Sequence, residues 1–125
     1  MYKAEITEFY SRDGHTLSVK EKVKFKDTTG CLKLDEATQE GEVLIDPASW
    51  GVLHIKNDRS ESGEYDNYVV ADRSGVRYVT GSSSFWRSFM DIVEEMQGEE
   101  DWSVRVYRSP SKNYKGKDFI TCSVE

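Results

Sequence analysis

The sequence predicts an α+β domain, mostly antiparallel β, built around one amphipathic helix. Several segments alternate apolar and polar residues and are separated by turn sequences that contain glycine, which is typical of antiparallel strands. One later segment instead repeats its apolar residues at the spacing of a helix with one buried face. At 125 residues and 37% hydrophobic content, the chain is expected to form a single domain, residues 1–125.

The N-terminal segment predicts a β-hairpin over residues 1–26. Residues 2–10 and 15–26 flank a turn ending in Asp13-Gly14, and Asp-Gly between two alternating segments is a strong hairpin signal. In the second predicted strand, residues 15–26, one face would be apolar and the other basic. The apolar face would carry Leu17, Val19, Val23 and Phe25, and the basic face Lys20, Lys22, Lys24 and Lys26.

The middle of the chain is ambiguous up to Trp50. Leu32 and Leu34 could end a strand, residues 35–41 fit a polar loop or a short helical turn, and Pro47 stops regular structure. Strand signals return at residues 52–55 and are followed by a polar loop over residues 56–63. Residues 65–71 and 76–80, joined by Asp72-Arg73-Ser74-Gly75, predict another hairpin.

The C-terminal part predicts the helix and two last strands. The helix is expected at about residues 84–97, capped by Ser82, Ser83 or Ser84 and ended by Gly98. The residues expected to face the core are Phe85, Phe89, Ile92 and Met96. Trp102, Val104 and Val106 alternate inward, as do Ile120, Cys122 and Val124, and residues 108–118 form a polar loop between them.

From Trp50 onward the predicted order is three strands, one helix and two strands. This order resembles the OB-fold over about 75 residues. The resemblance implies an OB-like β-barrel core at residues 50–125, with residues 1–26 as an added hairpin, and a single-stranded nucleic-acid-binding module. Residues 78–82 with the following helix, and residues 110–119, also look like parts of small phage-encoded or mobile-element proteins.

Charge is unevenly distributed, although the chain carries −6 overall. The last predicted hairpin combines cations with aromatic rings, which single-stranded nucleic acid needs for its phosphates and bases. The sequence therefore predicts binding of single-stranded DNA or RNA, with little sequence preference, through this hairpin. The predicted phosphate contacts are Arg105, Arg108, Lys112, Lys115 and Lys117, and the predicted stacking residues are Tyr107, Tyr114 and Phe119. An ordinary solvated hairpin is the alternative interpretation.

Two further charged segments suggest other interactions. The lysines at positions 20, 22, 24 and 26 could contact nucleic acid, or could protect a strand edge from aggregation. Residues 35–66 hold nine acidic and two basic residues. Such a surface could dock on a basic groove of a partner protein, as a phage-type inhibitor of a host nuclease such as a CRISPR effector would, or could simply keep a loop region soluble.

Neither catalysis nor a cofactor is predicted. His15 and His54 are far apart in the sequence, and no phosphate-binding loop, nucleophile motif or metal-ligand spacing occurs. His54 is expected to be a hydrogen-bonded core residue, and Cys31 and Cys122 to be small buried apolar groups. With no apolar signal core or membrane span in the sequence, a cytoplasmic location without membrane association is expected.

Overall fold

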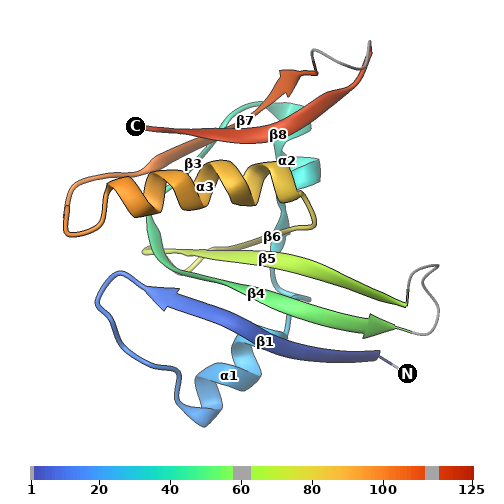
Figure 1. Ribbon diagram of the computed structural model, residues 1–125, viewed down its shortest axis with the longest axis vertical. Helices are drawn as coiled ribbons and strands as arrows, with labels where there is room; N and C mark the ends of the chain where they lie inside the picture. The colour runs from blue at the N-terminus through green and yellow to red at the C-terminus, as the bar shows by residue number, and fades with distance from the viewer. Residues whose placement is uncertain (1, 58–62, 112–115) are drawn as a thin grey trace. The chain divides into compact units, whose positions relative to one another are not determined.

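The computed structural model describes residues 2–57, 63–111 and 116–125 (Figure 1). The chain divides into two compact units. The first unit comprises Met1–Leu32 and Pro47–Gly81, and the second comprises Lys33–Asp46 and Ser82–Glu125. Each unit therefore joins segments that are far apart in the sequence. That residues 1–125 act as a single domain stays a prediction.

The first unit contains most of a five-stranded sheet in the order β1-β4-β5-β6-β2, in which β1–β4, β4–β5 and β5–β6 are antiparallel pairs. The hairpin predicted around residues 72–75 is confirmed, since Asp72 and Val76 are joined by a backbone hydrogen bond of 2.7 Å. The strand predicted at residues 52–55 is confirmed as part of the longer strand β4. The strands are β1 (Tyr2–Ser11), β2 (Leu32–Lys33), β4 (Pro47–Asn57), β5 (Glu64–Asp72) and β6 (Arg77–Thr80).

The predicted N-terminal hairpin is wrong. β1 pairs with β4 instead, and the end of the supposed second strand is a helix, α1 (Val19–Lys26). The Ser18 side chain accepts a hydrogen bond from the Glu21 N–H (3.2 Å), and Glu21 Oε1 accepts one from the Ser18 N–H (3.1 Å). This capping box stabilises the start of a helix. Residues two apart do not share a helix face, so the four lysines form no single row.

The core of the first unit lies between its sheet and α1. Phe25 is the buried residue of α1, and its ring meets that of Phe9 edge-on, with centroids 5.5 Å apart. The buried cluster consists of Phe25, Leu53, Ile55, Val69 and Val79. Cys31 packs against this cluster but is only partly buried, so its predicted burial is half correct.

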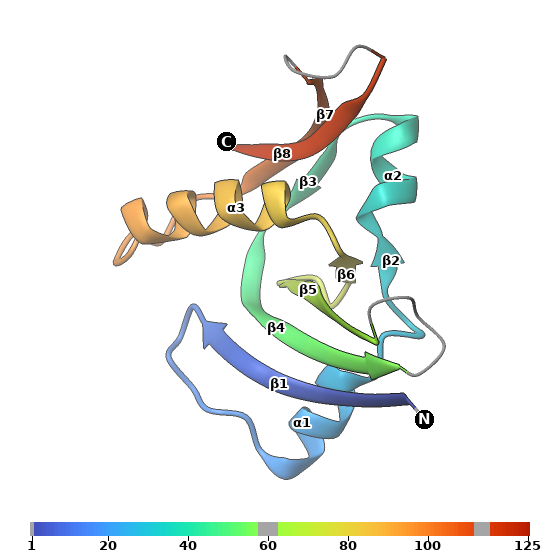
Figure 2. The ribbon, with the colours of Figure 1, turned by 45° about the vertical axis from the view of Figure 1, so that its right-hand side comes forward.

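The second unit contains a three-stranded antiparallel sheet in the order β3-β7-β8. Helix α3 (Ser83–Glu95) runs beside β8 (Figure 2), where the Ser84 hydroxyl donates to the Ile120 carbonyl (3.0 Å). The ambiguous residues before Trp50 form β2, α2, β3 and the start of β4. The prediction that Pro47 stops regular structure is wrong, because Pro47 is the first residue of β4, a position that tolerates proline. The bounds are α2 (Leu34–Glu40), β3 (Val43–Ile45), β7 (Val104–Pro110) and β8 (Asp118–Val124).

The predicted helix is confirmed as α3. Ser82 caps it by accepting a hydrogen bond from the Phe85 N–H (3.2 Å), and Gly98 follows the helix with a φ of 90°. Phe85 and Phe89 are fully buried, as expected. Ile92 and Met96 are only partly buried, so the buried stripe is shorter than predicted. Cys122 is buried, which raises the pKa of its thiol to about 12.

The α+β class with mostly antiparallel strands is therefore confirmed, with three helices in place of one among the described residues. The described strands form two sheets and close no barrel, so the OB-like arrangement of residues 50–125 stays a prediction. Within the described part of the chain, every helix is too short or too polar to cross a membrane.

Candidate binding face on the β3-β7-β8 sheet

Three residues of the predicted nucleic-acid site share one face of the second unit's sheet. Side chains alternate along a strand, so Arg105 and Tyr107 point to the same side of β7. Tyr107 pairs with Thr121, and two residues along Ser109 pairs with Phe119. Phe119 therefore joins Arg105 and Tyr107 on this side, which we call the outer face. The opposite face carries the buried residues Val104, Val106, Ile120 and Cys122.

The two aromatic rings of the outer face differ in how firmly they are held. The Tyr107 hydroxyl lies 2.7 Å from Ser123 Oγ, and the Arg105 guanidinium carbon lies 5.6 Å from the centre of the Tyr107 ring. The hydrogen bond fixes the hydroxyl end of Tyr107, and the Arg105 guanidinium lies over its ring. Phe119 is 38% exposed and presents its ring near the end of the hairpin.

Arg105 is shared between the outer face and nearby carboxylates. Its Nε lies 3.5 Å from Glu42 Oε2 and 4.0 Å from Glu125 Oε2. The side chains of these ion pairs are about half exposed, so each pair contributes only about 0–1 kcal/mol to stability. Another anion can therefore replace the carboxylate beside Arg105. A phosphate that binds Arg105 would have to compete with Glu42.

Arg108 is placed apart from the other predicted site residues. It lies on the same side of β7 as Val104 and Val106, and its guanidinium donates to Thr38 Oγ1 (3.1 Å) and to the Asp35 carbonyl (2.6 Å). Both acceptors belong to α2, so Arg108 fastens α2 to β7. The structure thus separates Arg108 from Arg105, which the sequence had grouped together.

The remaining predicted residues lie at the end of the hairpin. Lys117 is exposed. Lys112, Tyr114 and Lys115 fall outside the described residues.

β3 contributes to this face, which the sequence did not predict. Leu44 pairs with Arg105 across the sheet and is 61% exposed, and Glu42 immediately precedes β3. The short apolar run Val43-Leu44-Ile45 was the available signal, but three residues do not distinguish a strand from a loop.

Two histidines outside this face contact carboxylates. On the first unit's sheet, His54 Nδ1 lies 2.9 Å from Asp66 Oδ1, and its Nε2 lies 3.4 Å from Glu64 Oε1. These contacts raise the pKa of His54. The His54 side chain is 30% exposed, so its predicted place in the core is wrong. His15 contacts Asp13 and Glu21 in the same way, and its pKa is also raised.

None of these groups forms a metal site. Among residues 2–57, 63–111 and 116–125, no three His, Cys, Asp or Glu side chains gather in a geometry that could hold an ion.

The acidic segment 35–66 is divided between the two units. Asp35, Glu36, Glu40, Glu42 and Asp46 belong to the second unit, whereas Glu64 and Asp66 lie on β5 of the first. Asp58 and Glu61 fall outside the described residues.

No protein-family model matches this chain, and no curated protein or solved structure matches it either.

Proposed function

We propose that the chain binds single-stranded nucleic acid, DNA or RNA, with little sequence preference through the outer face. The observation that carries the proposal is that Arg105, Tyr107 and Phe119 lie on one sheet face with part of their surface open. Flat aromatic rings stack on any base, and a guanidinium binds the phosphate between bases. A site of this kind binds a strand without changing it chemically, so a non-enzymatic role is part of the proposal.

The place of these residues in the β7–β8 hairpin also supports nucleic-acid binding. In OB-folds, which the order of elements from Trp50 onward resembles, the loop between the last two strands commonly contacts the ligand. Lys117 lies at this end of the hairpin and would contribute a further phosphate contact. The proposal includes the origin and location that the sequence suggests: a phage or mobile element encodes the protein, and it acts in the cytoplasm.

Fluorescence anisotropy with a labelled oligothymidine of 20 nucleotides tests the proposal. Tyr107→Ala and Phe119→Ala should each weaken binding by about 5- to 150-fold, equivalent to about 1–3 kcal/mol per lost stacking contact. Tyr65→Ala is the matched control, because Tyr65 is also 38% exposed but lies on β5 of the first unit. The proposal fails if the oligonucleotide does not bind at about 20–50 mM salt, where screening is weak.

A second candidate function is binding of a basic protein, for example a host nuclease inhibited by a phage protein. The observation that favours it is a group of carboxylates on neighbouring strands of the first unit: Asp66 and Glu5 both lie across from His54, and Glu64 contacts its ring. Charge reversal of Glu64 and Asp66 should then remove partners from a pull-down. Recovery of the same proteins by the wild type and the variant would exclude this function.

A further inference from the structure

The C-terminal end of helix α1 is anchored to the first unit, and its N-terminal end is exposed. Phe25, in the last turn, is the buried residue of the helix. The Arg77 guanidinium of β6 donates a hydrogen bond of 2.6 Å to the Lys24 carbonyl in the same turn. Val19, in the first turn, is 79% exposed. A helix of eight residues is marginal by itself, so the order of its first turn depends on the contacts made there.

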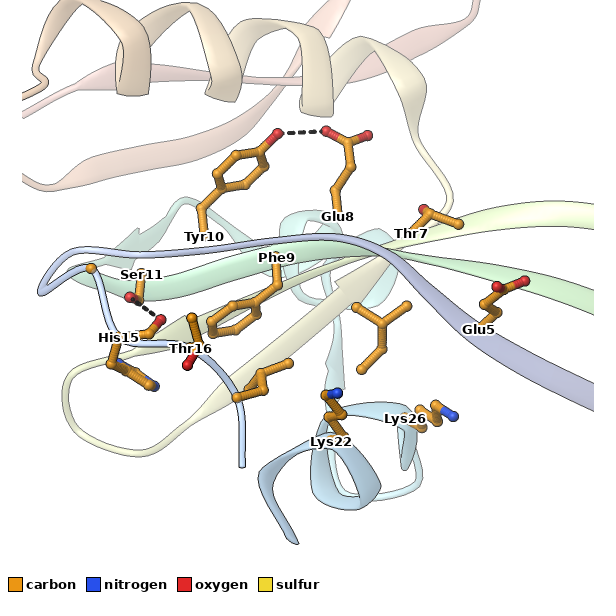
Figure 3. Close-up of a pocket in the computed structure, with 13 residues that line it drawn as sticks. Glu5, Thr7, Glu8, Phe9, Tyr10, Ser11, His15, Thr16, Lys22 and Lys26 are labelled. Carbon is orange, nitrogen blue, oxygen red and sulfur yellow. Dashed lines mark hydrogen bonds between the residues drawn. The ribbon is translucent and has the colours of Figure 1, made fainter. Parts of the chain in front are cut away.

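His15 connects this first turn to β1. Its Nε2 lies 3.2 Å from Glu21 Oε2 on α1, and its Nδ1 contacts Asp13 Oδ1 in the loop after β1. The imidazole also meets the ring of Phe9 on β1 edge-on, with centroids 5.9 Å apart. Figure 3 shows His15 and Phe9 on the same side of β1, where the Ser11 hydroxyl donates a hydrogen bond of 3.1 Å to the His15 carbonyl. The ring therefore touches the strand, the loop and the helix.

Glu21 uses its two carboxylate oxygens for different contacts. Oε1 accepts the Ser18 N–H in the capping box, whereas Oε2 faces His15. The capping box is local to the helix, and His15 joins it to β1. A change at His15 therefore acts on the residue that orders the start of α1.

Both contacts of the His15 ring require its proton. An imidazole can donate to two carboxylates only when both ring nitrogens carry a hydrogen, and the neutral ring turns one lone pair toward a carboxylate. Asp13 Oδ1 also accepts the backbone N–H of His15 (3.1 Å), which keeps Asp13 beside the ring. Loss of the proton should therefore break the contact with Glu21.

The two carboxylates keep their charge near neutral pH, so His15 is the member of this group that titrates there. Hydrogen bonds from the ring and backbone of His15 lower the pKa of Asp13 to about 2, and hydrogen bonds with Ser18 lower the pKa of Glu21. The pKa of His15 is raised, chiefly by the hydrogen bond to Asp13 and further by Glu21. The other charged residues that line the groove beside His15 are Glu5 and Glu8 of β1 and Lys22 and Lys26 of α1.

We propose that His15 is a proton-dependent clasp for α1: the protonated ring joins Glu21 to Asp13 and holds the first turn to the loop after β1, and loss of the proton releases this turn. Phe25 keeps the last turn in place in both states. Because folding raises the pKa of His15, the clasp is complete below the unfolded value of about 6.5 and is lost as pH rises through the higher folded value.

The Cα chemical shifts of residues 19–22, measured by NMR, report how much of the first turn is helical. Between about pH 5.5 and pH 9, the equilibrium constant for the ordered turn should fall about two- to fivefold, the range of an exposed ion pair. The midpoint should match the titration of the His15 ring protons. Shifts that do not change with pH would overturn the proposal.

Glu21→Gln is the matched control for this experiment. Glutamine keeps the capping box but brings no charge to His15, so the titration of His15 should no longer change the helix content of the first turn. An equal pH response in Glu21→Gln and the wild type would mean that the shifts report the nearby charge alone, and would overturn the proposal.

Two histidine variants with the same replacement separate the clasp from other titrations. His15→Gln should abolish the pH dependence of the first turn, because glutamine does not exchange a proton. His54→Gln should retain it, since Asp66 and Glu64, the carboxylates that His54 contacts, both lie on β5, which is already paired with β4. A pH response that survives in His15→Gln or disappears in His54→Gln would contradict the clasp. Far-UV circular dichroism checks that both variants are folded.

Discussion

Gly51 of β4 packs so closely against Phe25 of α1 that a Cβ atom at position 51 would lie 2.8 Å from Cζ of that ring. The carbonyl oxygen of Glu8 on β1 would be closer still. Gly51 pairs with Phe9, whose ring meets Phe25 edge-on. The missing side chain therefore lets the sheet and α1 approach each other at the centre of the first unit's core.

Gly51→Ala should lower the free energy of unfolding by about 1–3 kcal/mol, the usual cost of forcing extra volume into a packed core. Denaturation in urea measures the change. Gly30→Ala is the control, because a Cβ atom there would lie 3.6 Å from a nitrogen of the flexible Arg77 side chain, an ordinary contact. Equal stability of the two variants would show that the tight packing at Gly51 is not needed.

Phe89→Ala should cost about 3–5 kcal/mol of stability, because Phe89 is fully buried and its ring stacks on Phe85 at 5.6 Å. Glu94→Ala, on an exposed position of the same helix, should change stability by less than about 0.5 kcal/mol. A loss below about 1 kcal/mol in folded Phe89→Ala protein would mean that the apolar side of α3 does not belong to the core.

The pKa of His54 should fall toward the ordinary value of about 6.5 when Asp66 is replaced by Asn, because the hydrogen bond to Asp66 is the main cause of its rise. NMR titration of the ring protons measures the change. The raised pKa of His15, which depends on Asp13, serves as the internal control and should stay the same. An unaltered His54 pKa in Asp66→Asn would contradict the assigned contact.

The same contact gives stability a defined pH dependence. Because the folded state binds the His54 proton more tightly than the unfolded state, its stabilisation is complete below the unfolded pKa of about 6.5 and is lost as pH rises through the higher folded pKa. The stability difference between wild type and His54→Gln should therefore shrink from pH 6 to pH 8. If the stability difference grew from pH 6 to pH 8, the raised pKa of His54 could not be its cause.

Glu42→Gln should strengthen oligonucleotide binding, because it removes the charge of the nearer of the two carboxylates that pair with Arg105 beside the outer face. Glu36→Gln is the control. Glu36 lies on α2, and no contact between Glu36 and Arg105 is found, so this variant removes the same charge and should have a smaller effect.

Salt dependence gives a second measurement of the same site. With two to four phosphates bound, the slope of log affinity against log salt should be about −1.4 to −2.8. Weaker binding in Glu42→Gln would argue against Arg105 as a phosphate contact.

Local signals in the sequence were sufficient for α3 and for the β5–β6 hairpin. Ser82, the helical spacing of Phe85 and Phe89, and Gly98 act within a few residues of one another, as do Asp72 and Gly75 in the turn. Alternation alone also placed Arg105, Tyr107 and Phe119 on one face, because the period of a strand fixes the side to which each residue points.

Tertiary structure decided the rest. Residues 19–26 alternate as a strand would. The Ser18–Glu21 capping box was a local signal for a helix at this position, and the burial of Phe25 against the sheet is the tertiary contact that stabilises it. β1 pairs with β4, whose partner residues lie 38 to 55 positions later in the sequence, and no local pattern specifies such a pairing or the bulge at Thr7. The role of Arg108 also depends on a contact distant in sequence. Its hydrogen-bond acceptors lie on α2, and Thr38 is 70 residues earlier in the chain. Sequence periodicity fixes the direction of a side chain relative to its own strand, whereas long-range packing determines what that side chain meets.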